Sequence, residues 1–335
     1  MIKYILGIGV AFMFANFLIV HDSKEDESLI IIPVGFPEID FPEDNLPSVE
    51  RINLGKRLFF DTLMSKDFSV SCASCHKPHL AFSDNLRFSI GSDLAEGKSN
   101  APSLANVAYS PYLNRDGGVP TLEMQVLVPI QEHLELDMNI LEIAERMNED
   151  PSYIDMSMIA YNRVPDPYVI TRALANFERT LISGQSRFDQ YYYQGDKKQL
   201  TKEERKGMDL FFSDKAQCSS CHGGFTFTNY AFENNGLYEQ YIDSGRIRLT
   251  AEESDRALFK VPTLRNLEFT SPYMHDGSME TIEEVVEHYS NSIAAHKNRS
   301  IKLKPFHFSK KEKEHLVAFL KSLSDEKFIE KQSVR

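Results

Sequence analysis

The sequence predicts an all-α fold, organised as two small helical domains in one chain with few, short strands. Three observations lead to this prediction. The pattern Cys-x-x-Cys-His occurs twice and accounts for all four cysteines. Each copy follows a Gly-x-x-Leu-Phe-Phe segment, which begins at Gly55 in the first and at Gly207 in the second and indicates an internal duplication. In other segments, apolar residues recur every three or four positions, as they do on one face of a helix.

Helix signals place the elements around these motifs. The helical spacing of apolar residues occurs in segments 139–147, 167–182 and 309–325. Ser309 is the predicted N-cap of the last segment. Thr201 and Glu204 form a capping box, which predicts a helix that leads toward the second cysteine motif. In each copy we expect a helix to run up to the motif and to turn its Leu-Phe pair inward.

The chain divides at a polar, glycine-containing segment, residues 190–201, which is the predicted linker. The N-terminal domain then covers residues 26–190 and the C-terminal domain residues 191–335, with a tail that can pack back on the first domain. Residues 1–25 combine a short charged start, sixteen mostly apolar residues and a polar exit, the pattern of an export signal. The sequence leaves open whether this segment is cleaved or kept as a membrane anchor, and we expect a periplasmic or other extracytoplasmic location.

Composition narrows the class of function. With 335 residues, 42% hydrophobic and 26% charged, the chain has the composition of a soluble globular protein large enough for two domains. The formal charge of −12 argues against a nucleic-acid ligand, whose phosphates need a basic face. The same charge is compatible with a basic protein partner. The sequence also leaves a homodimer open.

The two cysteine motifs carry the strongest chemical signal. Their residues are Cys72, Cys75, His76, Cys218, Cys221 and His222. Cys-x-x-Cys-His is the attachment pattern of c-type haem, in which both thiols bind the haem covalently and the adjacent histidine ligates the iron. Two cysteine pairs could instead hold one zinc ion, but then the histidine after each pair has no role. They could also form redox disulfides, but neither pair lies in a thioredoxin-like strand context. The sequence therefore predicts two c-type haems, one in each domain.

Several longer segments resemble a known family. These are "LGKRLFFD", "NAPSLANVAY", "FERTLISGQSRFD" and "VPTLRNLEFTSPYMHDG", together with the two haem motifs. They are similar to the bacterial di-haem cytochrome c peroxidases and their relatives of the methylamine-utilisation (MauG) type, from about residue 33 to about residue 325. The resemblance implies that hydrogen peroxide reacts at the N-terminal haem. It also implies that the C-terminal haem passes electrons or stores oxidising equivalents.

The resemblance also carries two catalytic residues over to this chain. The glutamine and glutamate of the family's peroxide pocket match Gln125 and Glu135. A carboxyl group in a dry pocket can take a proton from one peroxide oxygen and return it to the other, and an amide can orient the peroxide. The family's inter-haem calcium implies, in addition, oxygen ligands from the Asn100 side chain and from the backbones of Thr270 and Pro272.

Two positions depart from the peroxidase pattern. The loop histidine that caps the N-terminal haem in many of these peroxidases matches Ser92, which predicts a five-coordinate, permanently open iron. The family's tryptophan between the haems matches Arg115, and this chain contains no tryptophan. Tyr109, Tyr112 and Tyr273 are then the candidate relays between the haems.

The distal ligand of the C-terminal haem is predicted from a helix that begins at a capping box, Thr281 with Glu284. Its apolar face consists of Ile282, Val285, Val286 and Tyr289. His288 falls on another face and is expected to be solvated. Tyr289 matches the position at which the peroxidases place methionine and the MauG-type enzymes tyrosine, so it is the favoured ligand. Weaker candidates are Met274, Met279 and His275, the last more suited to a supporting role.

Three functions follow from these residues. The first is a peroxidase that takes electrons from a small cytochrome or another reductant. The second is a MauG-type enzyme that uses peroxide to oxidise side chains of a partner protein, which a tyrosine ligand at Tyr289 favours because an anionic oxygen stabilises oxidised iron. The third is a di-haem electron carrier without catalysis, which Gln125, Glu135 and the missing cap at Ser92 disfavour.

Overall fold

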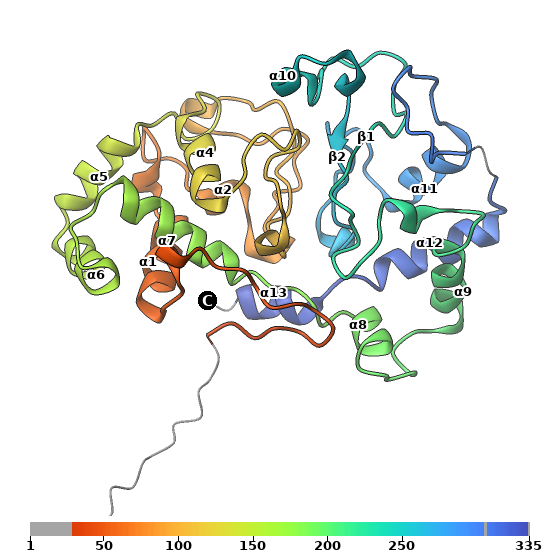
Figure 1. Ribbon diagram of the computed structural model, residues 1–335, viewed down its shortest axis with the longest axis horizontal. Helices are drawn as coiled ribbons and strands as arrows, with labels where there is room; N and C mark the ends of the chain where they lie inside the picture. The colour runs from red at the N-terminus through yellow and green to blue at the C-terminus, as the bar shows by residue number, and fades with distance from the viewer. Residues whose placement is uncertain (1–28, 305–306, 334–335) are drawn as a thin grey trace, which may run out of the picture.

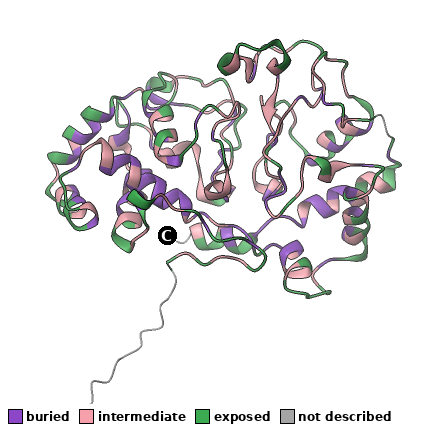
Figure 2. Ribbon diagram, in the orientation of Figure 1, coloured by how far each residue is buried: buried purple, intermediate pink, exposed green. Residues whose placement is uncertain are grey.

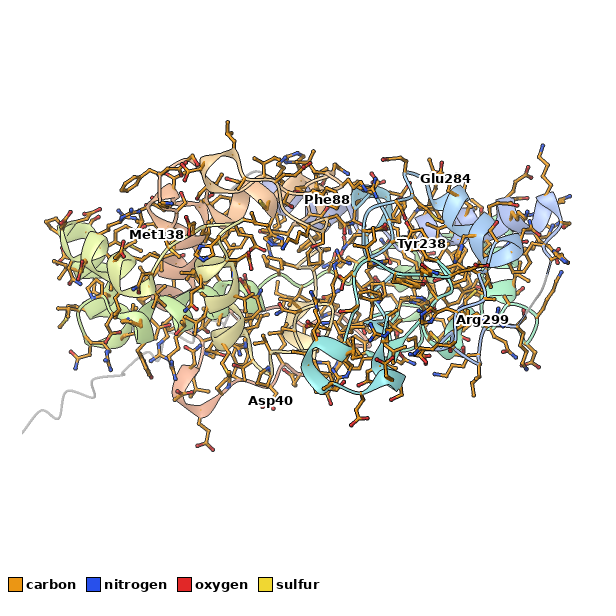
Figure 3. All side chains as sticks on the ribbon, turned by 90° about the horizontal axis from the view of Figure 1, so that it is seen from above. Asp40, Phe88, Met138, Tyr238, Glu284 and Arg299 are labelled. Carbon is orange, nitrogen blue, oxygen red and sulfur yellow. The ribbon has the colours of Figure 1, made fainter. Side chains whose placement is uncertain are left out.

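In this computed structural model, the structure describes residues 29–304 and 307–333. The predicted export segment, residues 1–25, lies outside the described residues. The described chain forms two lobes of helices and long loops that lie side by side (Figure 1). Figure 3 views them from above, with Met138 in the first lobe and Arg299 in the second. Within the described residues, none of the helices has the length and apolar character required to cross a membrane.

The all-α prediction is confirmed, because helices make up the regular structure of the described residues, apart from one pair of two-residue strands. The helices are α1 Val49–Phe60, α2 Cys72–Cys75, α3 Leu122–Gln125, α4 Leu127–Gln131, α5 Ile140–Asn148, α6 Pro151–Tyr161, α7 Pro167–Arg179, α8 Arg187–Tyr192, α9 Lys202–Phe211, α10 Ile247–Thr250, α11 Ile282–Asn291, α12 Lys310–Lys321 and α13 Glu326–Ser333. The strands β1 Phe232–Glu233 and β2 Phe259–Lys260 pair antiparallel in the second lobe.

The capping signals act as the sequence predicts. The Thr201 hydroxyl accepts from the backbone N–H of Glu204 at the start of α9, and Thr281 does the same for Glu284 at the start of α11. Ser309 caps α12. The helices α1 and α9 end at Phe60 and Phe211, however, so a loop rather than a helix leads into each cysteine motif.

Both lobes are built around the same helix crossing. In the first lobe α1 crosses α7, and a Cβ on Gly55 would lie 1.8 Å from the backbone oxygen of Ala173. In the second lobe α9 crosses α12, and a Cβ on Gly207 would lie 1.9 Å from the backbone oxygen of His315. Each glycine therefore allows two helix backbones to touch, which explains why both copies of the repeat begin with glycine. Figure 2 shows the buried residues concentrated along these crossings.

The core of each lobe is completed by an aromatic pair from the crossing helices. Phe59 packs on Phe177 with ring centroids 5.0 Å apart, and Phe211 packs on Phe319 at 5.2 Å. The predicted boundary at residue 190 shifts slightly, because Phe188 in α8 belongs to the second core. At the other end of the chain, α13 lies against the first lobe, where Phe328 packs on Phe82. The C-terminal tail therefore crosses back to the first domain (Figure 1).

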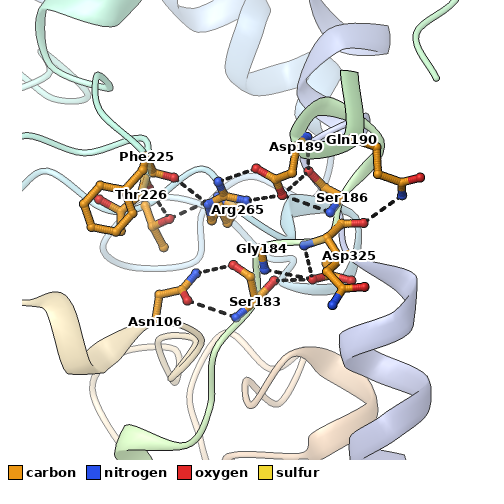
Figure 4. A network of polar contacts seen from close by, with 12 residues as sticks. Asn106, Ser183, Gly184, Ser186, Asp189, Gln190, Phe225, Thr226, Arg265 and Asp325 are labelled. Atoms are coloured by element: carbon orange, nitrogen blue, oxygen red, sulfur yellow. Dashed lines mark hydrogen bonds and ion pairs between the residues drawn. The ribbon is translucent and has the colours of Figure 1, made fainter. Parts of the chain in front are cut away.

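A buried polar network fixes the junction between the lobes (Figure 4). Arg265 donates to both carboxylate oxygens of Asp189, at 2.7 and 2.8 Å, and both side chains are fully buried. Asp325 accepts from the backbone N–H groups of Gly184 and Gln185 at 3.0 and 2.8 Å. Residues 184–189, which come just before the predicted linker, are therefore held by charged side chains from the second half of the chain. These contacts set the two lobes in one relative position.

Candidate haem sites

The first histidine of the cysteine motifs is oriented by a backbone carbonyl. His76 follows α2, and its Nδ1 lies 2.8 Å from the backbone oxygen of Phe82. A carbonyl oxygen only accepts hydrogen bonds, so Nδ1 carries the proton and Nε2 keeps its lone pair for a metal. Burial lowers the pKa of His76, which favours the neutral imidazole that binds iron.

The second motif repeats this arrangement. His222 Nδ1 lies 3.1 Å from the backbone oxygen of Pro262 and 3.3 Å from that of Phe227. Burial lowers its pKa to about 4. The four cysteines are free thiols, and burial raises the pKa of Cys75 to about 11 and of Cys218 to about 12. Uncharged sulfurs beside a preoriented, neutral imidazole fit a covalently attached haem, because a thioether carries no charge into the interior.

Glu135 lies near the first motif. Burial raises its pKa, and the neighbouring Glu132 carboxylate adds to the increase. Glu135 as a whole is exposed, but the chain around its carboxyl group favours the protonated form more than water does. Burial is also the main cause of the raised pKa of Cys72 and Cys75, and the Glu135 charge contributes to both. A carboxyl that influences both thiols is placed beside the haem that they would bind.

The loop before Glu135 is held in place by Ser92. The Ser92 side chain is buried, and its hydroxyl donates to the backbone oxygen of Leu136 at 3.1 Å. Its backbone N–H donates to the oxygen of Glu135 at 2.7 Å. The hydroxyl is thus engaged with the protein backbone, and the residue secures the Glu135 segment. Gln125 ends α3 and is partly buried.

In the second lobe, Tyr289 and Met274 meet at one amide. The Asn235 side-chain nitrogen lies 3.5 Å from the Tyr289 hydroxyl and 3.4 Å from the Met274 sulfur. Burial raises the pKa of Tyr289 to about 12, and the nearby thiols of Cys218 and Cys221 add to the increase. The tyrosine therefore lies close enough to the second cysteine pair to sense its charge, as a ligand of the same haem must.

The expectation that His288 is solvated is wrong. Its side chain is buried, 3% exposed, and Nε2 lies 3.2 Å from the backbone oxygen of Asn235. Helical periodicity placed it off the apolar face of α11, but the loop around Asn235 covers that side of the helix. His275 stacks on Phe259 with ring centroids 4.2 Å apart, and Met279 pairs through its backbone with Tyr273.

The predicted calcium ligands have other partners. The side-chain and backbone oxygens of Asn100 accept from the Arg115 guanidinium at 2.5 and 2.8 Å. The Asn100 amide nitrogen donates to the backbone oxygen of Pro272 at 2.7 Å. Calcium requires six to eight oxygen ligands directed at one point, and here a cationic side chain occupies the asparagine oxygens. The Asn100 and Pro272 oxygens are thus already engaged, and the backbone oxygen of Thr270 is a single ligand. These residues therefore do not fit the calcium site that the sequence predicted.

The candidate relay tyrosines occupy different environments. Tyr109, on the first lobe, donates to the backbone oxygen of Pro37 and packs against Phe225 with ring centroids 4.9 Å apart. Tyr112 is 46% exposed. Tyr273 donates to the backbone oxygen of Leu267 at 2.7 Å. Both Tyr109 and Tyr112 make an aromatic contact across the junction. Tyr109 contacts the segment directly after the second haem motif, and Tyr112 packs on Phe232 with ring centroids 6.0 Å apart.

Comparison with known proteins places this arrangement in a family. A family model described as di-haem cytochrome c peroxidase matches residues 49–198. The methylamine utilization protein MauG of Methylorubrum extorquens is 34% identical over 309 residues, which cover 91% of this chain and 87% of that protein. The cytochrome c551 peroxidase of Nitrosomonas europaea is 35% identical over 285 residues, which cover 83% and 80%. The chain belongs to the di-haem cytochrome c peroxidase family.

Solved structures agree with this assignment. A MauG-like protein associated with microbial copper homeostasis superimposes with a TM-score of 0.84 and 34% identity over 89% of this chain and 96% of that one. The di-haem peroxidase BthA of Burkholderia thailandensis has the same fold, with a TM-score of 0.75 and 22% identity over 90% and 94% of the two chains. Di-haem peroxidases carry two c-type haems, and the two Cys-x-x-Cys-His copies supply one attachment site in each lobe.

Two residues of this di-haem peroxidase were missed by the sequence analysis. Asn235 joins Tyr289 and Met274, and no local pattern marks it. Glu178, in the "FERTL" segment, is 6% exposed, and one of its carboxylate oxygens has no hydrogen-bond partner among the described residues. Burial raises the pKa of Glu178 to about 8. The sequence signal that could have identified Glu178 is its position as an acidic residue on the apolar face of an amphipathic helix.

Proposed function

We propose that this protein is an exported di-haem peroxidase that reduces hydrogen peroxide in its first lobe, using electrons that enter through the second. The observation that carries the proposal is Glu135, a carboxyl with a raised pKa beside the first cysteine pair. A haem attached at Cys72 and Cys75 and ligated by His76 would supply the iron that binds peroxide and the electrons that cleave it. The predicted export signal supports a reaction outside the cytoplasm.

The chain's own residues handle the protons. The Glu135 carboxylate accepts a proton from the peroxide oxygen nearer the iron and returns it to the farther oxygen, which leaves as water. The raised pKa suits this double role, because the group must both bind and release a proton near neutral pH. Gln125 assists Glu135 by supplying an amide that orients the peroxide. Ser92 keeps its hydroxyl on the protein backbone, which supports a first site that is permanently open.

Electrons reach the first lobe from a donor docked outside the second. A small cytochrome with a basic face suits the formal charge of −12. Purified holoenzyme mixed with a reduced basic cytochrome and peroxide is expected to oxidise the cytochrome at a rate that saturates with peroxide. Absence of turnover with a panel of reduced small cytochromes, in holoenzyme that still reacts with peroxide, would argue for the second candidate below.

The second candidate is a MauG-type enzyme that oxidises side chains of a partner protein. Tyr289 favours it, because a tyrosine oxygen is a harder and more anionic ligand than methionine and lowers the potential of the iron that it binds. Two of the relatives described above are a MauG and a MauG-like protein. An oxidised residue on a protein that co-purifies with this chain, detected by mass spectrometry, would support this candidate directly.

Replacing Tyr289 separates a ligand from a core tyrosine. The variant Y289F is expected to change the visible spectrum of the oxidised holoenzyme and the spectrum that develops after peroxide is added, because an oxygen ligand is lost. M274L removes the sulfur that shares Asn235, and Y192F is a control at an exposed position, 59% accessible. Unchanged spectra in Y289F would eliminate Tyr289 as a ligand, and a change in M274L instead would transfer the role to Met274.

A further inference from the structure

Arg115 occupies the junction between the two haem lobes. Its guanidinium donates through Nη2 to the backbone oxygen and to the side-chain oxygen of Asn100. Asn100 is itself buried and donates across the junction to the backbone oxygen of Pro272 in the second lobe. The guanidinium, the amide and the carbonyl thus form one chain of hydrogen bonds from the first lobe to the second.

The surroundings keep this side chain charged. An arginine side chain stays protonated in proteins, and the carboxylates of Asp243 and Asp276 interact electrostatically with Arg115. The group therefore remains a cation at neutral pH. Its own backbone is fixed as well, because its carbonyl accepts from the N–H of Lys260 at 2.7 Å. A partly buried cation that is held in one position supplies the same kind of local positive charge as a bound metal ion.

The duplication shows that this cation is particular to the first lobe. Asn106 and Asn266 occupy equivalent places and share a left-handed backbone, with φ values of 62° and 63°. The ninth residue after each is Arg115 in the first lobe and His275 in the second. The second lobe therefore has an imidazole where the first has a guanidinium.

We propose that the Arg115 guanidinium is the resident cation between the two haem domains and stands in place of the calcium ion that the family resemblance implies. It takes the oxygens of Asn100 that a calcium ion would need, and it ties the two lobes together through Asn100 and Pro272. Its positive charge would stabilise the reduced, more negative form of a haem held in either lobe. This inference is independent of which reductant or protein the enzyme oxidises.

Metal analysis of the holoenzyme tests the first part. After exhaustive dialysis, calcium should be far below one ion per chain, and a calcium chelator should change neither the spectra nor the midpoint of thermal unfolding. One tightly held calcium ion per chain, whose removal lowers that midpoint, would overturn the proposal. Peroxide turnover measured in the same samples keeps this result separate from the proposed function.

Two variants test the role of the charge. R115Q keeps a hydrogen-bond donor without the charge and should shift both haem reduction potentials downward, whereas R115K should restore them. R248Q removes an exposed arginine of the same junction, 55% accessible and paired with Asp116, and should leave the potentials unchanged. Unaltered potentials in R115Q, or an equal shift in R248Q, would refute the role of Arg115. If R115Q does not fold, the metal analysis of wild type and R115K still decides the question.

Discussion

The two lobes share one plan for holding a haem and differ in what they place opposite it. In both, a glycine lets two helices touch, a carbonyl orients the motif histidine, and an asparagine anchors the following loop. The N–H of Asn106 donates to the Leu181 oxygen at 2.7 Å, and that of Asn266 donates to the Leu323 oxygen at 3.3 Å. These shared features belong to the core of each lobe and to the motif histidine, because each lobe must hold a haem in the same way.

The difference appears after the shared N-caps, Thr121 and Thr281. In the second lobe α11 runs unbroken, and Tyr289 is the eighth residue after its cap. In the first lobe the eighth residue is Pro129, within the short helix α4 that follows α3. Proline has no group that binds iron, and the chain beyond it brings in Glu135. With Tyr289 as the ligand that we propose, one helix register would supply a ligand to the second site and leave the first open for substrate.

The largest expected effect comes from a substitution in the first lobe, at the site that we propose is open to peroxide. E135Q should slow the reaction of holoenzyme with peroxide by about 10² to 10⁴-fold, because the amide cannot take up or return a proton. The ionised carboxylate is the active base and its pKa is raised. The wild-type rate should therefore fall as the pH drops through a value above 4.5, and E135Q should lose that limb. Stopped-flow spectroscopy measures both.

The matched control is E132Q, which removes the exposed neighbouring carboxylate. It should leave the rate near that of wild type and lower the pKa that the pH profile reports, because a like charge is removed. Equal losses in E132Q and E135Q would mean that the effect is one of overall charge and not of proton transfer.

A second contrast concerns stability. The residue before Asn266 is Arg265, whereas the residue before Asn106 is Ala105. R265M leaves the fully buried Asp189 without its partner, which should cost about 3–5 kcal/mol of unfolding free energy. Chemical denaturation followed by circular dichroism measures the loss. K321Q removes the exposed Lys321–Glu283 pair of the same lobe and should cost at most about 1 kcal/mol. Comparable losses would mean that the pair at the junction is not a structural tie.

The smallest expected effect comes from a substitution that makes the first lobe resemble the second. The residue after Phe319 is Leu320, and the residue after Phe177 is the buried Glu178. E178L copies the second lobe into the first and should stabilise the protein by about 1–3 kcal/mol at neutral pH, because an unsatisfied carboxyl is removed.

The pH dependence of this stabilisation has a defined sign. The native state holds the Glu178 proton more tightly than the unfolded chain does, so wild-type stability falls as the pH rises from the ordinary value of 4.5 through about 8. The advantage of E178L should grow over the same range in denaturation curves. A peroxide reaction that slows in E178L without loss of stability would instead assign the carboxyl to the chemistry of the first site.

The sequence by itself determined the features that depend on neighbours along the chain. Spacing alone specified the two haem motifs, the helices that begin at Thr201, Thr281 and Ser309, and the duplication, because capping and helical periodicity are local effects. The two-lobed helical fold follows from the same patterns. Helical spacing placed Tyr289 on the apolar face of its helix. Family resemblance gave Tyr289 the role of a ligand and added Glu135 and Gln125.

Tertiary structure decided what depends on contacts between distant segments. His288 is buried because a loop more than fifty residues earlier in the chain covers it, and helical periodicity cannot register such a cover. Asn100 and Pro272 meet across the junction, and the Arg115 guanidinium donates to the side-chain oxygen of Asn100, a set of contacts that no local pattern predicts. The local sequence determines the face of the helix on which a side chain lies. Only the packed fold determines which partner, charge or solvent meets it there.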